Sequence, residues 1–173
     1  VEYVRHGIKW DQWIQNFKDY LFLNKQYGEY GIAFDLTITT PGLFSLKALF
    51  DLAVELDVNT LIKTTFAFDS SIMMCPQVLP RDIYDEVIDD LLNYIRPRVE
   101  GKPKHLNWIE CLEDLKQRKV FSEQYPDWKQ GLKKGKENLA RVDKWRKQEN
   151  VLNEIYKKDN PKLYRWWTKN HMI

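Results

Sequence analysis

The sequence predicts an α/β fold class, in which a small parallel sheet is covered by helices and followed by a helical C-terminal extension. Two segments have the composition of strands: 32–39 alternates apolar and polar residues, and 60–68 is rich in β-branched and aromatic residues. Between them, an apolar stripe at helical spacing runs from Leu46 to Leu56. A strand, a helix of about twelve residues and a second strand form a right-handed crossover that joins parallel strands.

Turn signals mark the ends of these elements. The Pro41-Gly42 pair ends the first strand, Ser45 is placed to cap the following helix, and residues 57–59 form the return to the second strand. Before the first strand, apolar residues recur at three- and four-residue spacing. This pattern predicts an amphipathic helix from Trp10 to about Lys25.

Further helices are predicted in the second half of the chain. Pro80 suits the first turn of a helix whose broad apolar face extends to Ile95. Another helix is predicted over residues 107–120. Beyond residue 125 the chain is polar and basic, with spaced apolar anchors of which Trp145 is the last before the final aromatic segment.

Charge is unevenly distributed along the chain. Residues 129–173 contain 13 Lys or Arg and 5 Asp or Glu, whereas residues 1–128 contain 14 and 20. We divide the chain into a sheet-containing segment, a partial (β/α) barrel over residues 1–100, and a helical, basic C-terminal extension over residues 101–173. A basic extension on an acidic body indicates either an anionic partner or docking of one part on the other.

The composition is that of a globular protein. The chain has 173 residues, of which 43% are hydrophobic and 14% aromatic. No apolar run approaches the roughly 18 residues of a membrane span, and the N-terminus has no signal-peptide pattern. We therefore expect a cytoplasmic protein without membrane contact. Cys75 and Cys111 are the only cysteines, which argues against a disulfide framework and against a cysteine-rich metal site.

Polar residues on the strands are the candidate functional residues. If the apolar residues of the first strand face the helices, then Asp35, Thr37 and Thr39 face the opposite way, and Lys63 alternates similarly on the second strand. In a parallel barrel or half-barrel, polar groups near the C-terminal ends of the strands form the ligand site. The alternative is structural: a buried ion pair between Asp35 and Lys63, with threonines hydrogen-bonded between layers.

Four segments resemble one enzyme family. They are EYVRHGIKWDQWIQNF, LTITTPGLFSLKALFDLAVELDV, IMMCPQVLP and VDKWRKQENVLNEIYKKDNPKLYRWW. The motif residues are the start Tyr3-Val4-Arg5-His6-Gly7 with Trp10, the triplet Thr37-Ile38-Thr39, the helix start Leu79-Pro80, and the residues Asp143, Arg146 and Pro161. These segments resemble the C-terminal half of a radical S-adenosylmethionine enzyme of the twitch type, which has a shortened auxiliary region. The sequence departs from the family at Gly42, where the family often has an Asn that contacts the cofactor.

The resemblance implies a partial TIM-like barrel fragment in which Thr37, Thr39 and Lys63 bind the cofactor, and it assigns no catalytic residue. The full enzyme would use S-adenosylmethionine and a 4Fe-4S iron–sulfur cluster held by the three thiolates of C-x-x-x-C-x-x-C. That motif is absent here. We therefore expect this chain alone to bind neither group and to catalyse no radical reaction by itself.

A missing part follows from the resemblance. The chain starts at VEYVRHG without an initiating Met, so we expect an N-terminal half or a partner chain that carries the cluster. A sheet edge left exposed by the missing strands would also favour self-association. The alternative is a diverged relative that kept the scaffold and lost the chemistry.

A second hypothesis is a non-enzymatic binding module whose basic, aromatic tail contacts nucleic acid or a protein partner. Trp145, Trp166 and Trp167 would stack on bases. The cations that would meet phosphates are Lys133, Lys134, Lys136, Arg141, Lys144, Arg146 and Lys147. The alternative for this tail is a solvated helix whose aromatic residues pack on the body of the protein.

Overall fold

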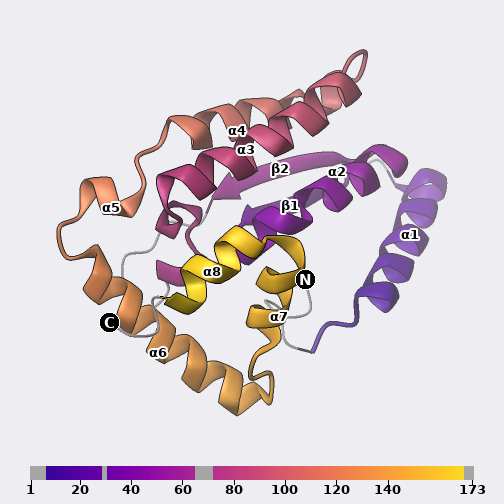
Figure 1. Cartoon of the computed structure of the whole chain (residues 1–173). Helices are drawn as coiled ribbons and strands as arrows, with labels where there is room; N and C mark the ends of the chain where they lie inside the picture. The colour runs from indigo at the N-terminus through magenta and orange to yellow at the C-terminus, as the bar shows by residue number, and fades with distance from the viewer. Residues whose placement is uncertain (1–6, 29–30, 65–71, 170–173) are drawn as a thin grey trace.

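The computed structural model describes residues 7–28, 31–64 and 72–169, which form helices around a two-stranded parallel sheet (Figure 1). The strands are β1 (Ala33–Ile38) and β2 (Asn59–Thr64). The α-helices are α1 (Trp10–Tyr27), α2 (Leu46–Glu55), α3 (Arg81–Ile95), α4 (Leu106–Gln117), α5 (Phe121–Gln124), α6 (Trp128–Arg146), α7 (Val151–Asp159) and α8 (Pro161–Lys169). Short 3₁₀ turns are η1 (Pro41–Ser45), η2 (Ile72–Met74), η3 (Pro76–Val78), η4 (Arg96–Arg98) and η5 (Pro103–His105).

The strand–helix–strand unit confirms the α/β prediction. β1 and β2 are parallel, with Ala33 opposite Asn59 and Ile38 opposite Thr64, and α2 lies between them in the chain. The predicted second strand extended to Phe68, and its part beyond Thr64 lies outside the described residues. The Ser45 cap is wrong. Ser45 makes no side-chain capping hydrogen bond because it is the last residue of η1 and already has near-helical backbone angles, whereas a capping residue is extended.

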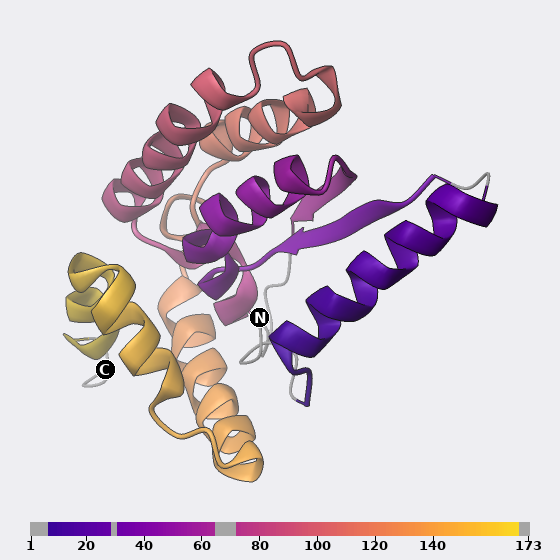
Figure 2. The same cartoon turned by 90° about the vertical axis from the view of Figure 1, so that its right-hand side faces the viewer.

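The helices cover one face of the sheet. Phe34 of β1 contacts Phe17 of α1 at a ring-centroid distance of 4.7 Å, and Asn107 of α4 donates a hydrogen bond to the Thr60 carbonyl oxygen of β2. The opposite face carries Asp35 and Leu61 at directly paired positions, and both are exposed. Figures 1 and 2 show α2, α3 and α4 stacked on one side of the strands, with α1 alongside β1. The sheet therefore has one covered face and one open face.

The core is centred on α3, which packs against both α2 and α4. Pro80 precedes α3, as predicted, and the apolar face of the helix is fully covered. Its buried side chains are Ile83, Tyr84, Val87, Ile88, Leu91, Leu92 and Ile95. The Tyr84 hydroxyl donates a 2.6 Å hydrogen bond to the Leu115 carbonyl oxygen of α4. Because α4 contacts both α3 and β2, residues 106–117 pack as part of the sheet-containing body.

The C-terminal helices α6, α7 and α8 pack onto the body. Gly135 of α6 lies so close to η2 that a Cβ atom there would sit 2.7 Å from Ile72 Cγ2, so only glycine allows this approach. At the corner between α6 and α7, Lys147 and Asn150 both have left-handed backbone angles. The prediction of Trp145 as a packing anchor is wrong: its side chain is 80% exposed because it lies on the face of α6 that points away from the body. Among the described helices, none combines the length and the apolar character that a bilayer crossing requires.

Candidate functional site

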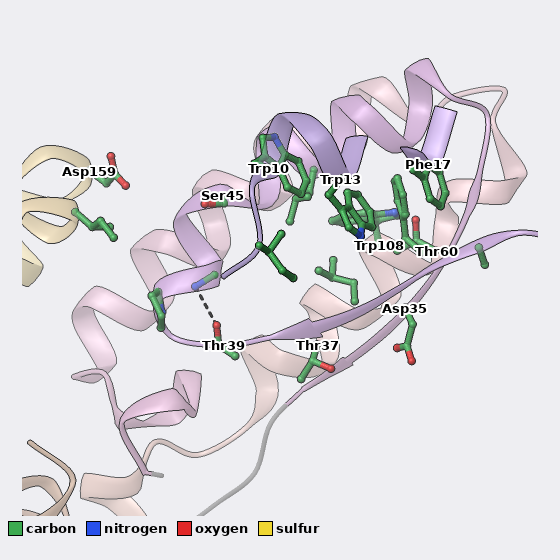
Figure 3. Close-up of a pocket in the computed structure, with 18 residues that line it drawn as sticks. Trp10, Trp13, Phe17, Asp35, Thr37, Thr39, Ser45, Thr60, Trp108 and Asp159 are labelled. Atoms are coloured by element: carbon green, nitrogen blue, oxygen red, sulfur yellow. Dashed lines mark hydrogen bonds between the residues drawn. The ribbon is translucent and has the colours of Figure 1, made fainter. Parts of the chain in front are cut away.

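A cavity of about 620 Å³ lies over the covered face of the sheet, between α1, β1, the start of α2 and α7 (Figure 3). Its wall is mainly apolar and aromatic. The lining residues are Ile8, Trp10, Trp13, Phe17, Ala33, Phe34, Asp35, Leu36, Thr37, Thr39, Pro41, Gly42, Ser45, Leu49, Thr60, Trp108, Ile155 and Asp159. The volume lies within the range of about 300–1,000 Å³ that is typical of small-molecule sites.

One wall of the cavity is a ladder of aromatic rings on α1. Trp10, Trp13 and Phe17 are spaced by three and four residues and therefore share one helix face. The Trp10 and Trp13 rings are 5.3 Å apart and tilted by 12°, and the Trp13 and Phe17 rings are 5.4 Å apart and tilted by 15°. Phe34 packs against both Trp13 and Phe17 from β1. The three rings of α1 therefore form an offset stack along one side of the cavity.

Two buried polar groups lie in the cavity wall. Thr60 of β2 is 2% exposed and Trp108 of α4 is 1% exposed. Within the part of the chain that the structure describes, neither the Thr60 hydroxyl oxygen nor the Trp108 indole nitrogen Nε1 has a hydrogen-bond partner. Buried polar groups in proteins are nearly always paired, and these two atoms are exceptions that expose almost no surface to the cavity. Sequence reasoning missed both residues, because each follows the ordinary pattern of a strand or a helix.

The structure does not bring Thr37, Thr39 and Lys63 together in this cavity. Thr37 borders it along β1, but in Figure 3 the Thr37 and Asp35 side chains extend away from the aromatic residues, onto the open face. The Thr39 hydroxyl, beyond the end of β1, accepts a 3.1 Å hydrogen bond from the Gly42 backbone N–H at the start of η1. Lys63 does not line the cavity. It lies directly opposite Thr37 in the strand register, on the open face.

The ion pair between Asp35 and Lys63 forms, with a distance of 2.8 Å between the Lys63 ammonium and the Asp35 carboxylate. Its predicted burial is wrong, because the two side chains are 61% and 59% exposed. None of the described elements covers this face of the sheet. The pair is therefore a surface interaction, which stabilises a fold by only about 0–1 kcal/mol.

The residues of this chain do not fit an iron–sulfur cluster of the radical-enzyme kind, which needs three thiolates. The chain has two cysteines, Cys75 and Cys111. Cys75 is buried at the end of η2, and partial burial raises the pKa of the Cys111 thiol, which disfavours the thiolate. No step that depends on a cluster can therefore be assigned to this chain. Of the residues that carry the family resemblance, Tyr3 to His6 lie outside the described residues.

The basic tail divides into an exposed and a buried part. Lys136 is buried and donates a 2.7 Å hydrogen bond to the Trp167 carbonyl oxygen, with its ammonium 4.3 Å from the Trp167 ring centre. Burial lowers the pKa of Lys136 to about 8. Trp167 itself is 4% exposed. The hypothesis that Lys136 and Trp167 contact a nucleic acid is therefore wrong, since α6 and α8 pack these side chains against each other.

Comparisons of the chain with protein-family models, with curated proteins and with solved structures found no match.

Proposed function

We propose that this chain is the C-terminal part of a radical S-adenosylmethionine enzyme of the twitch type, to which it contributes strands that line the cavity and a covering extension. The observation that carries the proposal is the two-faced parallel sheet. Helices lie on one face of β1 and β2, while the other face presents Asp35, Thr37 and Lys63. In a (β/α) barrel the helices form the outer layer and the opposite face of the strands lines the lumen.

The open face supplies suitable groups for a polar cofactor. Thr37 and Lys63 are directly opposite each other in the register, so their side chains are neighbours on one face. The Lys63 ammonium offers three hydrogen-bond donors and a positive charge, and the Thr37 hydroxyl both donates and accepts. Asp35, paired with Lys63, offers a carboxylate to hydroxyl or ammonium groups. Thr39, at the carboxyl end of β1, completes the predicted set.

The cluster and most of the cofactor contacts would come from the remainder of the enzyme, because this chain has too few cysteines. When bound, the cluster would supply the electron that cleaves S-adenosylmethionine. In this chain, S-adenosylmethionine would meet only the open-face residues. The chain is therefore one part of a cytoplasmic enzyme and is not catalytic alone.

The exposed apolar surface supports a missing neighbour. Leu61 on the open face of the sheet is 65% exposed, and Phe22, Leu23 and Tyr27 on α1 are 61%, 51% and 84% exposed. A two-stranded sheet is marginal by itself and gains stability from further strands. We infer that an N-terminal half or a partner chain covers these residues, and that self-association through the sheet edge takes its place when that part is absent.

The decisive experiment begins with the coding sequence upstream of Val1. An open frame that encodes C-x-x-x-C-x-x-C is expected, and the extended product, purified with its cluster, should cleave S-adenosylmethionine reductively to 5′-deoxyadenosine. Thr37→Val and Lys63→Met should each lower this activity by about tenfold or more if they remove one contact to the bound cofactor. Thr168→Val and Lys119→Met are matched controls away from the sheet.

Two results would overturn the proposal. An upstream frame without the cysteine triplet would remove the enzyme assignment. An active extended product in which Thr37→Val and Lys63→Met behave like their controls would remove the assignment of the open face as the cofactor site.

The second candidate function is binding of single-stranded nucleic acid, favoured by the exposure of Trp145. Lys134, Arg141 and Trp145 are spaced by seven and four residues and share one face of α6, opposite to the buried residues of that helix. No carboxylate in the described part of the chain forms an ion pair with Lys134 or Arg141, although Glu137 lies on the same face. An aromatic ring among unpaired cations is suited to stack a base and to contact its flanking phosphates.

Fluorescence anisotropy with a labelled single-stranded oligonucleotide tests this candidate. Binding should weaken as salt increases, and Trp145→Ala should weaken it by about tenfold, the value expected for loss of one base-stacking contact. Tyr27→Ala, which removes an exposed aromatic side chain elsewhere, is the control. Absence of binding at low salt would eliminate this function.

A further inference from the structure

Helix α1 carries a second, largely exposed apolar stripe beside the face that it turns toward the body. Phe17 and Leu21 lie on the body-facing side, and the stripe lies about a quarter of a turn away from them. We call it the α1 stripe. Its members follow one another at intervals of three, four, three and four residues: Trp13, Asn16, Tyr20, Leu23 and Tyr27. Figures 1 and 2 show α1 at the edge of the molecule, where this side of the helix is accessible.

We propose that the α1 stripe is the interface with a second copy of this chain, whose own α1 packs alongside it in parallel. The spacing is that of the a and d positions of a coiled coil over two heptads, which suits another helix as the partner. The inference goes beyond the proposed function and does not rest on it, because the stripe belongs neither to the open face of the sheet nor to its edge. Leu61, on the open face, and Phe22, on the opposite side of α1, remain for the missing half of the enzyme.

Asn16 indicates that the partner is an identical helix. It is exposed in the single chain, and its amide has both a donor and an acceptor. In a parallel pair each residue of the stripe meets its own counterpart, so the amide of Asn16 can bond to the amide of the partner's Asn16. An apolar helix would bury Asn16 without a hydrogen-bond partner, which is unfavourable. A single Asn in an apolar seam also fixes the register and the number of helices in coiled coils.

The charges of the molecule are compatible with self-association. All charged residues of α1 lie outside the stripe: Asp11, Lys18, Asp19 and Lys25. Two identical stripes therefore place no like charges opposite each other, which would oppose pairing. The net charge of the whole chain is only +2 at pH 7, so long-range repulsion between two copies is weak.

The exposed area of the stripe is sufficient for a weak dimer. Tyr20, Leu23 and Tyr27 are 58%, 51% and 84% exposed, and Trp13 is 37% exposed. With aromatic side chains of about 150–250 Å² each, these residues offer roughly 500 Å² per copy and about 1,000 Å² in the pair. That total is at the lower bound of about 1,000 Å² for a specific interface, and Tyr and Trp are enriched in such interfaces.

Sedimentation of the 173-residue chain over a range of concentrations tests the proposal. A monomer–dimer equilibrium is expected, with a dissociation constant of roughly 1–100 µM for an interface of this size. Leu23→Lys would set two ammonium groups against each other in the seam and should weaken the dimer by at least about tenfold. Phe22→Lys is the matched control, since it changes a neighbouring exposed residue on the opposite side of the same helix. Circular dichroism should show that both variants fold.

Oxidative cross-linking tests the parallel arrangement. Tyr27→Cys should form a disulfide between two copies, because position 27 of one α1 lies beside position 27 of the other. Phe22→Cys, treated in the same way, should not form this link. The parent chain controls for its own cysteines, Cys75 and Cys111.

Three results would overturn the proposal. A chain that is still monomeric at about 1 mM would leave the stripe to the missing half of the enzyme. A dimer that Leu61→Lys weakens and Leu23→Lys does not would place the interface on the sheet. A dimer that Leu23→Lys weakens but Tyr27→Cys does not cross-link would remove the parallel pairing and the role of Asn16. Cleavage of S-adenosylmethionine by the extended enzyme is a separate measurement, so failure here and failure of the proposed function are distinguishable.

Discussion

Helices α1 and α3 are similar in sequence pattern and very different in packing. Both have apolar residues at three- and four-residue spacing, and α1 is the longer, with 18 residues against 15. α3 buries seven of its side chains, whereas α1 buries none. The reason is position: α3 packs between α2 and α4, while α1 reaches the body mainly through Trp13 and Phe17 against Phe34.

The comparison shows what helical periodicity does and does not determine. It predicts which face of a helix turns toward the body, because apolar residues on one stripe lower the free energy when they leave water. It does not determine how many other elements cover that stripe. α1 therefore borders the cavity with no fully buried side chain, whereas α3 forms the centre of the core. Substitutions in matched pairs of residues test this difference between the two helices.

The largest expected effect comes from truncating one leucine in each helix. Leu92→Ala removes a side chain of α3 that is 2% exposed and should lower the free energy of unfolding by about 2–5 kcal/mol. Leu21→Ala removes a partly buried side chain of α1 and should cost about 1 kcal/mol or less. Urea denaturation of both variants measures the difference. Equal losses would mean that α1 is as firmly packed as α3.

The next largest effect concerns Lys136, a cation that is buried in the folded protein. The pKa of Lys136 is about 8 in the folded protein and 10.5 in the unfolded chain, so the folded state loses its proton first. Between these two pH values the unfolded chain binds more protons, and stability rises with pH. Relative to Lys136→Met, the parent protein should gain about 1–2 kcal/mol from pH 8 to 10.5. An identical pH dependence of the parent and the variant would contradict the burial of this charge.

A smaller effect is expected from removing a tyrosine hydroxyl. Tyr84→Phe leaves the Leu115 carbonyl oxygen without its 2.6 Å partner and should cost about 1 kcal/mol or slightly more. Tyr20→Phe is the control on α1, where the tyrosine is 58% exposed. In thermal unfolding, Tyr84→Phe should lower the midpoint temperature, whereas Tyr20→Phe should leave it unchanged. A comparable decrease for Tyr20→Phe would indicate a contact of α1 that the structure does not contain.

The smallest effect concerns the ion pair that joins α1 to α2. The Lys18 ammonium nitrogen Nζ lies 3.3 Å from the Glu55 carboxylate oxygen Oε1, and the two side chains are 42% and 64% exposed. Lys18→Ala should therefore change stability by less than about 0.5 kcal/mol, and added salt should abolish the change. Denaturation at low and high ionic strength measures it. A loss that persists in high salt would show that this pair does hold α1 in place.

Local pattern was sufficient to predict the strand–helix–strand unit and the whole buried face of α3, because each depends on residues close together in the sequence. The Asp35–Lys63 pair was also predictable, since the two strands fix their register. Its exposure was not, because exposure depends on which elements happen to cover that face. The same limit applies to Lys136, a lysine on a basic helix whose burial arises only when α8 packs over α6.

The candidate site was less predictable than the fold. The polar alternation of β1 indicated the open face, where Thr37 and Lys63 do lie. The cavity on the other face requires the relative placement of α1, α2, α4 and α7, which no short sequence window contains. Thr60 and Trp108 carry no local signal of function. Their unpaired polar atoms become visible only after β2 and α4 have been brought together.

The corner between α6 and α7 limits which residue types the chain can accept there. The Gln148 N–H donates to the Asp143 carbonyl oxygen and the Lys147 N–H to that of Lys144, a helix-ending pattern that usually places glycine where Lys147 stands. A β-branched residue would adopt the left-handed backbone angles of Lys147 only at a high energetic cost. Asn150 also has left-handed angles, which asparagine adopts more readily than most residues. Relatives of this chain should therefore carry Gly, Asn or an unbranched residue at position 147. The position of Asp159 at the cavity thus depends on backbone angles set twelve residues earlier.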